Sequence, residues 1–141
     1  MIKIDYNKKI LLVTGGTGGH IYPALSVFNY LKNSSCKVSI ITDKRGLNNR
    51  NLNLHKPFLI NIKGYAGKSA LNKLYSLILV IISTIKSILY LKKENINLII
   101  GFGSYVQVPV LLAAKILRID FILHEANAVL GKANKIFWSF A

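Results

Sequence analysis

The chain has 141 residues, the length of a single domain, and its 19 lysines and arginines against 5 acidic residues give a formal net charge of +14. With 52% hydrophobic residues and a mean hydropathy of +0.39, it is more apolar than most soluble proteins but too polar for a polytopic membrane protein. The single cysteine, Cys36, excludes an intramolecular disulfide and indicates a reducing cytosol, where we expect it to pack as a small apolar side chain.

The positive charge favours polyanionic partners, namely nucleic acid, anionic lipid surfaces or phosphorylated substrates. A compositional explanation stands beside this one. The abundance of Ile, Asn and Lys is typical of an AT-rich coding sequence, which raises the lysine content without selection for it. Residues 1–9 are polar and charged, so no secretory signal is expected.

The first predicted element is a strand over residues 10–14, an apolar run suited to burial on both faces of a sheet. It leads into Gly15-Gly-Thr-Gly-Gly-His20, where residues without a Cβ allow a tight turn and a close approach of N–H groups to a ligand. Apolar residues at helical spacing over 22–32 predict a helix, with Pro23 in its first turn. Strand, glycine turn and helix start together predict a site for an anion such as phosphate.

The next segment predicts the completion of a β-α-β unit. Residues 37–42 form the second predicted strand, and the connection between the two strands should be right-handed. Residues 43–55 show no periodicity and are interpreted as a loop or a short irregular helix. A third short strand is expected over residues 57–62, followed by a flexible basic loop over 64–68.

Residues 71–93 are strongly apolar and raise the question of a membrane span. Lys73 and Lys86 leave only the twelve residues 74–85 uncharged, whereas crossing a bilayer takes about 20 residues. We therefore expect a long helix that is mostly buried against the sheet. Its richness in Ile, Leu and Tyr also allows the alternative that one face rests on a membrane surface.

The last third of the chain repeats the design of the first. A buried strand in residues 98–105 ends in a second glycine turn, a helix is expected over 108–117 with Pro109 in its first turn, and a strand follows over 120–124. A last helix should begin near Lys132 and run to the end of the chain. This alternation predicts an α/β fold, an open parallel sheet with helices on both faces.

Three polar loops fall at the carboxyl ends of predicted strands, where ligands bind in such sheets: residues 15–20, 101–105 and 124–127. The first loop is neither a P-loop nor Gly-x-Gly-x-x-Gly, and Asp43 alone supports dinucleotide binding. His20 is a candidate general base or phosphate ligand, or else a helix-end residue bonded to the backbone. Glu125 is placed either to accept hydrogen bonds from sugar hydroxyls or to hold a neighbouring loop. No cluster suggests a metal site.

These motifs together resemble the MurG family, the UDP-N-acetylglucosamine:lipid-linked muramyl pentapeptide N-acetylglucosaminyltransferases of peptidoglycan synthesis. The first loop, with Tyr22-Pro-Ala24 behind it, is similar to the family's N-terminal signature. Gly101-Phe-Gly-Ser-Tyr105 resembles its Gly-x-Gly-Gly-Tyr loop, and His124-Glu-Ala-Asn127 its His-Glu-Gln-Asn. Gly131-x-x-Asn134-Lys135 follows the family pattern too. The resemblance runs from about residue 10 to the end.

The resemblance implies a GT-B enzyme with two Rossmann-like domains and an active site between them. Residues 1–141 would be the N-terminal, acceptor-binding and membrane-facing domain, ending within its last helix. The C-terminal donor-binding domain is absent, which suggests a fragment, a split gene or a truncated product. The implied reaction is inverting transfer of N-acetylglucosamine from its UDP form to the C4 hydroxyl of undecaprenyl-diphosphate-linked muramyl pentapeptide (lipid I to lipid II). It takes place at the cytoplasmic face of the bacterial inner membrane without metal or other cofactor.

The resemblance also implies roles for single residues. His20 would be the catalytic base. The residues implied for the sugar nucleotide are Thr17, Gly18, Gly19 and Asn127. Those implied for the acceptor and its diphosphate are Gly15, Gly16, Gly103, Ser104, Tyr105, Glu125 and Asn134. The sequence departs from the family pattern at Ser104, which replaces a glycine, and at Ala126, which replaces a glutamine.

Two other functions stand beside this one. One is a non-catalytic membrane-docking subunit that recruits a separate donor-binding domain. The other, a nucleic-acid-binding protein, rests on charge alone and lacks a recognition motif, so no nucleic acid is expected.

Overall fold

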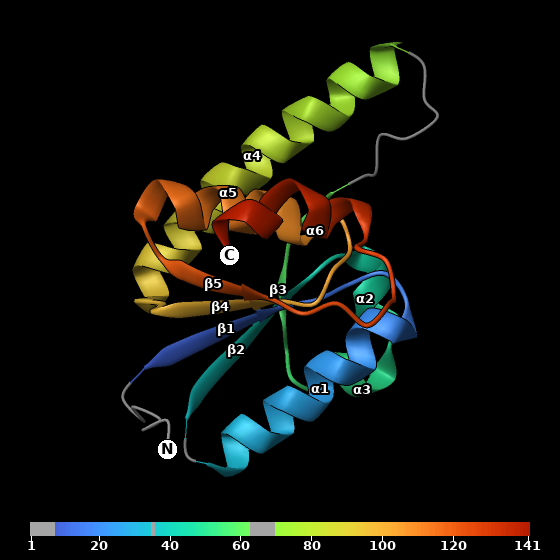
Figure 1. The fold of residues 1–141 in the computed structure, drawn as a ribbon. Coiled ribbons are helices and arrows are strands. Elements are labelled where there is room, and N and C mark those ends of the chain that lie inside the picture. Colours follow the sequence, from blue (N-terminus) through green and yellow to red (C-terminus); the bar gives the residue numbers. More distant parts are fainter. Residues whose placement is uncertain (1–7, 35, 63–69) are drawn as a thin grey trace.

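The computed structural model describes residues 8–34, 36–62 and 70–141. The basic loop expected at 64–68 lies outside the described residues. The strands form one parallel sheet in the order β3-β2-β1-β4-β5, and Figure 1 shows helices on both of its sides. The expected Rossmann-like α/β fold is confirmed. The strands are β1 (Lys9–Val13), β2 (Lys37–Thr42), β3 (Phe58–Leu59), β4 (Leu98–Gly101) and β5 (Asp120–Leu123).

Helices occupy the connections between these strands and the segment after β5. They are α1 (Gly18–Asn33), α2 (Lys44–Leu47), α3 (Arg50–Asn53), α4 (Ala70–Glu94), α5 (Gln107–Leu117) and α6 (Lys132–Phe137), with a 3-10 turn η1 (Trp138–Phe140). The last helix thus begins where predicted, but it gives way to the 3-10 turn after Phe137.

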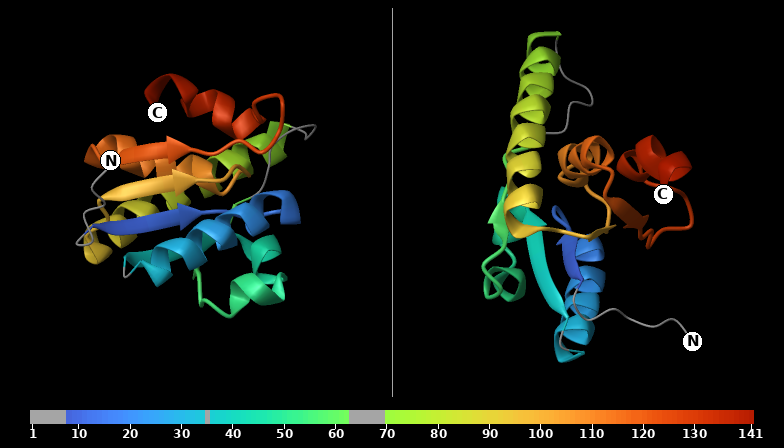
Figure 2. Two further views of the ribbon diagram at one scale, coloured as in Figure 1. Left: turned by 60° about the horizontal axis from the view of Figure 1, so that its bottom comes forward. Right: turned by 90° about the vertical axis from the view of Figure 1, so that its left-hand side faces the viewer.

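Alternating side chains of the central strand β1 divide the core into two layers. Leu11 and Val13 pack with residues of α4, α5 and α6 on one face of the sheet. Ile10 and Leu12 pack with α1 and α3 on the other face, where the thiol of Cys36 is buried as expected. Figure 2 shows from other directions how the helices lie on the two faces of the sheet. Burial of both faces explains why residues 10–13 of β1 form a continuous apolar run.

Two predicted elements have different bounds in the structure. Helix α1 begins at Gly18, four residues earlier than expected, so Pro23 lies inside the helix and not in its first turn. Proline has no N–H, and the helix therefore lacks the bond that residue 23 would donate to the Gly19 carbonyl. Strand β3 has two residues, although residues 57–62 were predicted as strand, because it pairs with β2 only through Phe58 and Leu59.

Helix α4 is the long helix that the sequence predicts, but the expectation that it is mostly buried is wrong. Figures 1 and 2 show its N-terminal half extending past the sheet and α5. The residues that it buries include serines, namely Ser76, Ser83 and Ser87, whereas large apolar side chains are exposed. These exposed side chains are termed the apolar face of α4: Leu71, Leu74, Tyr75, Leu77, Ile78, Ile81, Ile82, Ile85 and Leu89.

The small side chains on the buried side let α4 lie close along α5. The Ser83 hydroxyl also donates to the Asn61 carbonyl at 2.7 Å, and the Ser87 hydroxyl donates to the Ser83 carbonyl. By length and composition, Leu71–Glu94 is sufficient to cross a membrane, although Lys73 and Lys86 interrupt it. Over residues 71–87, α4 therefore buries serine and exposes large apolar side chains, the reverse of the usual distribution in a soluble helix. Near its C-terminal end, Leu91 is buried in the core as usual.

Candidate functional site

The three polar loops lie side by side at one edge of the sheet, as the sequence predicts. Val13 pairs with Gly101 and Gly101 with Leu123, so β1, β4 and β5 end at the same level. Backbone bonds continue the pairing beyond these ends, from the Phe102 N–H to the Val13 carbonyl and from the His124 N–H to the Gly101 carbonyl. The polar loops that follow the three strands are thereby fixed against one another.

His20 and Gly103 bring the first and second loops into direct contact. A Cβ on Gly103 would lie 2.5 Å from His20 Cδ2 and 2.7 Å from Nε2, and the φ of Gly103 is +93°. Glycine is thus required at this position both by the space and by the backbone conformation. The absence of a side chain at Gly103 allows the imidazole to lie directly on the second loop.

The imidazole of His20 is oriented by its own loop. His20 Nδ1 lies 3.3 Å from the Thr17 hydroxyl, and the His20 carbonyl accepts a bond from the Thr14 hydroxyl at 2.9 Å. His20 Nε2 has no hydrogen-bond partner among the described residues. When Nδ1 carries the proton and donates it to Thr17, the lone pair is on Nε2, as a general base requires.

The glycines of the first loop lead into the N-terminus of α1. Thr17 is the extended N-cap residue, and its side chain makes no capping bond, so Gly18 and Gly19 open the helix. The first N–H groups of a helix have no intrahelical partner and carry the positive end of the helix dipole. The structure therefore places the start of a helix immediately before His20, the kind of backbone position at which anions bind in other proteins.

Asp43 holds this loop in place through hydrogen bonds. Its buried carboxylate accepts bonds from the N–H groups of Gly16 at 3.3 Å and Gly46 at 2.9 Å, and it also pairs with Arg45. A Cβ on Gly15 would lie 2.8 Å from Asp43 Oδ1. The Asp43 carboxylate thus bonds to the protein's own N–H groups and to Arg45, and it does not face a site where a ribose could bind. Asp43 was the one residue that supported dinucleotide binding, so this support is lost.

A buried amide that the sequence analysis missed connects the second loop to the third. Gln107 is fully buried: its Oε1 accepts from the Gly103 N–H at 2.9 Å, and its Nε2 donates to Asn134 Oδ1. Asn134 Nδ2 donates in turn to the His124 carbonyl at 3.1 Å and to Glu125 Oε2 at 3.0 Å. The only sequence signal was a glutamine at the start of a largely apolar helix.

Glu125 holds the third loop together, which is one of the two roles considered for it. Its Oε1 accepts from the N–H of Asn127 at 3.1 Å and from that residue's Nδ2 at 2.8 Å, and its Oε2 accepts from the Gly131 N–H at 2.7 Å. These bonds, the Gly131 N–H first among them, lower the pKa of the Glu125 carboxyl from 4.5 to about 2.

The low pKa predicts how stability depends on pH. A carboxyl whose pKa is lower in the folded than in the unfolded state contributes stability that is complete above the unfolded pKa and is lost as the pH falls towards the folded one. In the Glu125→Gln variant, the NH2 group would replace an oxygen that accepts hydrogen bonds, so it would face N–H groups and lose those bonds. We expect a melting temperature below that of the parent chain at pH 7, with the difference shrinking between pH 4.5 and pH 2. Glu94→Gln controls for the loss of a negative charge, and a difference independent of pH would contradict the prediction.

Ser104, where the family has glycine, adopts the left-handed conformation that glycine favours, with φ +69°. Its hydroxyl lies near Gly16, is buried, and has no hydrogen-bond partner among the described residues. Tyr105 follows it, partly buried, in the turn before α5. The structure thus groups Gly15, Gly16, Thr17, His20, Gly103 and Ser104 around the first two loops. Glu125, Asn127 and Asn134 form a second group, joined to the first through Gln107.

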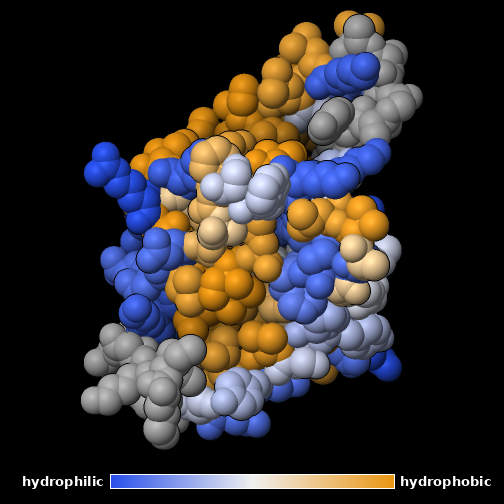
Figure 3. Space-filling view, viewed as in Figure 1, coloured by the Kyte–Doolittle hydropathy of each residue, from blue (hydrophilic) through white to orange (hydrophobic). Residues whose placement is uncertain are grey.

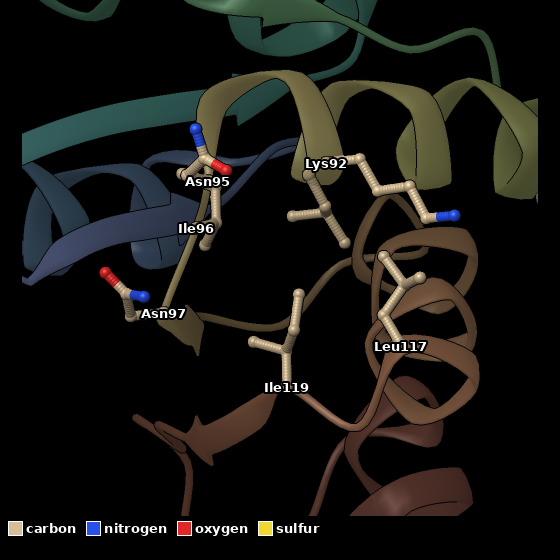
Figure 4. Close-up of a pocket in the computed structure, with 7 residues that line it drawn as sticks. Lys92, Asn95, Ile96, Asn97, Leu117 and Ile119 are labelled. Atoms are coloured by element: carbon tan, nitrogen blue, oxygen red, sulfur yellow. The ribbon is translucent and has the colours of Figure 1, made fainter.

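A separate groove of about 470 Å³ lies at the opposite edge of the sheet, near the amino ends of β4 and β5. Figure 4 shows Lys92, Asn95 and Ile119 around it. Parallel sheets bind ligands beyond the carboxyl ends of their strands. This groove is therefore not part of the site at the three loops.

The chain matches the family described as Glycosyltransferase family 28 N-terminal domain over residues 10–141. A relative from a Wolbachia endosymbiont of Brugia malayi is 39% identical over 132 residues, 94% of this chain and 36% of the relative. It is named UDP-N-acetylglucosamine--N-acetylmuramyl-(pentapeptide) pyrophosphoryl-undecaprenol N-acetylglucosamine transferase. A relative of the same name from Acinetobacter baylyi is 37% identical over 129 residues, 90% of this chain and 35% of the relative.

A crystal structure of Acinetobacter baumannii MurG superposes with a TM-score of 0.81 at 34% identity, covering 95% of this chain and 40% of that one. The chain thus spans a little over a third of the length of the curated relatives. The family match includes all three polar loops. The chain therefore belongs to the glycosyltransferase family 28 N-terminal domain family and is similar, within it, to the N-terminal part of MurG.

Proposed function

We propose that this chain is the acceptor-binding, membrane-facing part of an N-acetylglucosaminyltransferase of peptidoglycan synthesis. The donor is UDP-N-acetylglucosamine, and the acceptor is undecaprenyl-diphosphate-linked muramyl pentapeptide. The observation that carries the proposal is the contact of His20 with Gly103 at the meeting point of the loops. It leaves Nε2 without a partner among the described residues, next to the start of α1. The names and sequence identities of the relatives supply the substrate class.

The proposed reaction is a single displacement. His20 Nε2 takes the proton from the C4 hydroxyl of the muramyl sugar, and the oxygen attacks the anomeric carbon of N-acetylglucosamine from the face opposite UDP. The new C–O bond forms as the bond to the UDP oxygen breaks, and the electron pair leaves with the diphosphate. Attack from the opposite face inverts the configuration. Negative charge that develops on the diphosphate is stabilised by N–H groups at a helix start.

The contacts in the structure support the following proposed roles for the remaining residues. Thr17 orients His20, while Gly18 and Gly19 offer backbone N–H groups to a substrate. Gly15, Gly16, Gly103, Ser104 and Tyr105 remain proposed acceptor contacts. Glu125 and Asn134 are positioning residues because their polar atoms hold the third loop, and Asn127, proposed to contact the sugar nucleotide, is held by Glu125.

Transfer of labelled N-acetylglucosamine to the lipid-linked acceptor tests the proposal. The chain is assayed alone and together with the C-terminal part of Acinetobacter baumannii MurG, which supplies the proposed donor domain. Turnover only in the mixture is expected. The alternative of a non-catalytic membrane-docking subunit predicts none, even though the chain is folded by circular dichroism and bound to membranes.

The proposed location is the cytoplasmic face of the inner membrane, with α4 as the contact. Figure 3 shows hydrophobic side chains gathered over α4. Lys73, Lys86, Lys92 and Lys93 are exposed on the same helix. Transfer of the exposed leucines and isoleucines from water to the apolar part of a bilayer is favourable, and the neighbouring lysines are attracted to anionic headgroups. Both effects favour binding of α4 to a membrane surface.

Ile81→Asp is expected to lower binding of the chain to anionic phospholipid vesicles by about tenfold or more, because an inserted isoleucine contributes about 1.5–3 kcal/mol. Co-sedimentation with vesicles of phosphatidylglycerol and phosphatidylethanolamine measures the effect. Tyr30→Asp is the matched control, since Tyr30 is 65% exposed on α1 at the opposite face of the sheet. Equal losses for the two variants would assign the binding to net charge and not to α4.

A further inference from the structure

Arg45, in the short helix α2, lies beside the glycine turn of the first loop. Its Nε and Nη2 both donate to Asp43 Oδ2, at 3.2 Å and 3.1 Å. The carboxylate side chain is only 4% exposed, whereas that of Arg45 is 62% exposed. The buried Asp43 carboxylate thus fixes one side of the guanidinium, and the remaining N–H groups of Arg45 face solvent.

The guanidinium is directed to a specific place on the loop. A Cβ on Gly16 would lie 3.4 Å from Arg45 Nη2 and 3.3 Å from Ser104 Oγ, so both groups approach the same bare glycine. The Ser104 hydroxyl has no partner among the described residues. The positive φ of Gly16, +79°, and its bond to Asp43 keep this turn open to both side chains.

This arrangement has the chemistry of an oxyanion site. Arginine binds phosphate oxygens through paired N–H groups, and a guanidinium that is already fixed loses little entropy when it does so. The first turn of α1 adds N–H groups from the same loop. Asp43 is shielded behind the guanidinium, where it orients Arg45 without facing a ligand.

We propose that Arg45 is a binding residue for a diphosphate, oriented by Asp43 and placed over Gly16. The identity of the diphosphate rests on the proposed function, in which both the lipid-linked acceptor and UDP carry one. The interaction itself does not depend on transfer, because any diphosphate that reaches the loop meets the same donors.

Calorimetric titration of the chain with inorganic diphosphate tests the proposal without reference to catalysis. Arg45→Ala should weaken diphosphate binding about tenfold. Arg45→Lys keeps the charge but loses the paired N–H donors of the guanidinium, so its affinity should lie between those of the parent chain and Arg45→Ala. Arg50→Ala, an exposed arginine on α3, removes the same charge nearby and should change the affinity less than twofold. Equal weakening by the Arg45→Ala and Arg50→Ala variants, or no binding by the parent chain, would overturn the proposal.

The transfer assay then identifies the source of the diphosphate. A higher KM for the lipid-linked acceptor in Arg45→Ala, with an unchanged KM for the donor, assigns Arg45 to the acceptor, and the converse assigns it to UDP. Diphosphate binding that depends on Arg45, without turnover in any mixture, would refute the proposed function and leave the binding role intact. Thermal unfolding of each variant shows whether the chain is still folded.

Discussion

Replacement of His20 by alanine is expected to lower kcat of the reconstituted enzyme by about 10²–10⁴-fold, the usual contribution of a general base. The KM values of both substrates should change little, because in the proposed mechanism the imidazole acts on the proton of the attacking hydroxyl and not on the parts that bind. The measurement is the initial rate of labelled sugar transfer at saturating acceptor.

His55→Ala is the control for the loss of a histidine, since His55 packs against Phe28 of α1 and belongs to none of the three polar loops. The His20→Ala chain should unfold at nearly the same temperature as the parent, because among the described residues the imidazole that is lost has one long polar contact, with Thr17. A folded His20→Ala chain that retains most of the transfer rate would remove His20 from the mechanism.

Replacement of Gly103 by alanine is expected to reduce activity by about 10²-fold without removing any functional atom, since small misplacements of a catalytic group have effects of this size. The new methyl group would lie within 2.5 Å of the His20 ring, so the imidazole must move away. The φ of +93° adds backbone strain, and the free energy of unfolding should fall by about 1–3 kcal/mol.

Gly131→Ala is the matched control, because a Cβ there would lie 3.4 Å from the nearest atom, Glu125 Oε2, and the backbone φ is −62°. If Gly103 acts through His20, the Gly103→Ala change should have little further effect on kcat in a chain that already carries His20→Ala. Additive losses in the double variant would show that Gly103 affects transfer by some other route.

The strands, their order along the chain and the meeting of the three loops could be predicted because each depends on local signals. Continuous apolar runs identify buried strands, and parallel strands necessarily present their carboxyl ends at one edge. The start of α1 was misplaced because two glycines, which are poor helix formers, open it. The pattern of residues 71–93 indicates a helix but not which side is buried, and the spacing of Ser76, Ser83 and Ser87 was the overlooked sign.

The contacts that define the site could not be predicted, because they join residues distant in sequence. The bond from Gly16 to Asp43 and the bond from Gln107 to Asn134 each span 27 residues. The requirement for glycine at position 103 comes from the imidazole of a residue in another loop. A family resemblance identifies such positions but not their function. It grouped Glu125 with the acceptor contacts, whereas the structure uses the carboxylate to hold its own loop.

The buried amide of Gln107 also limits how related sequences can vary. It must accept from Gly103 with one atom and donate to Asn134 with the other, a combination that neither glutamate nor an apolar residue provides. A change at position 107 or 134 alone leaves a buried group unpaired, at a cost of about 1–3 kcal/mol. The two positions should therefore covary among homologues. A substitution at position 107 should be accompanied by a compensating substitution at position 134, or both residues should be replaced together by apolar ones.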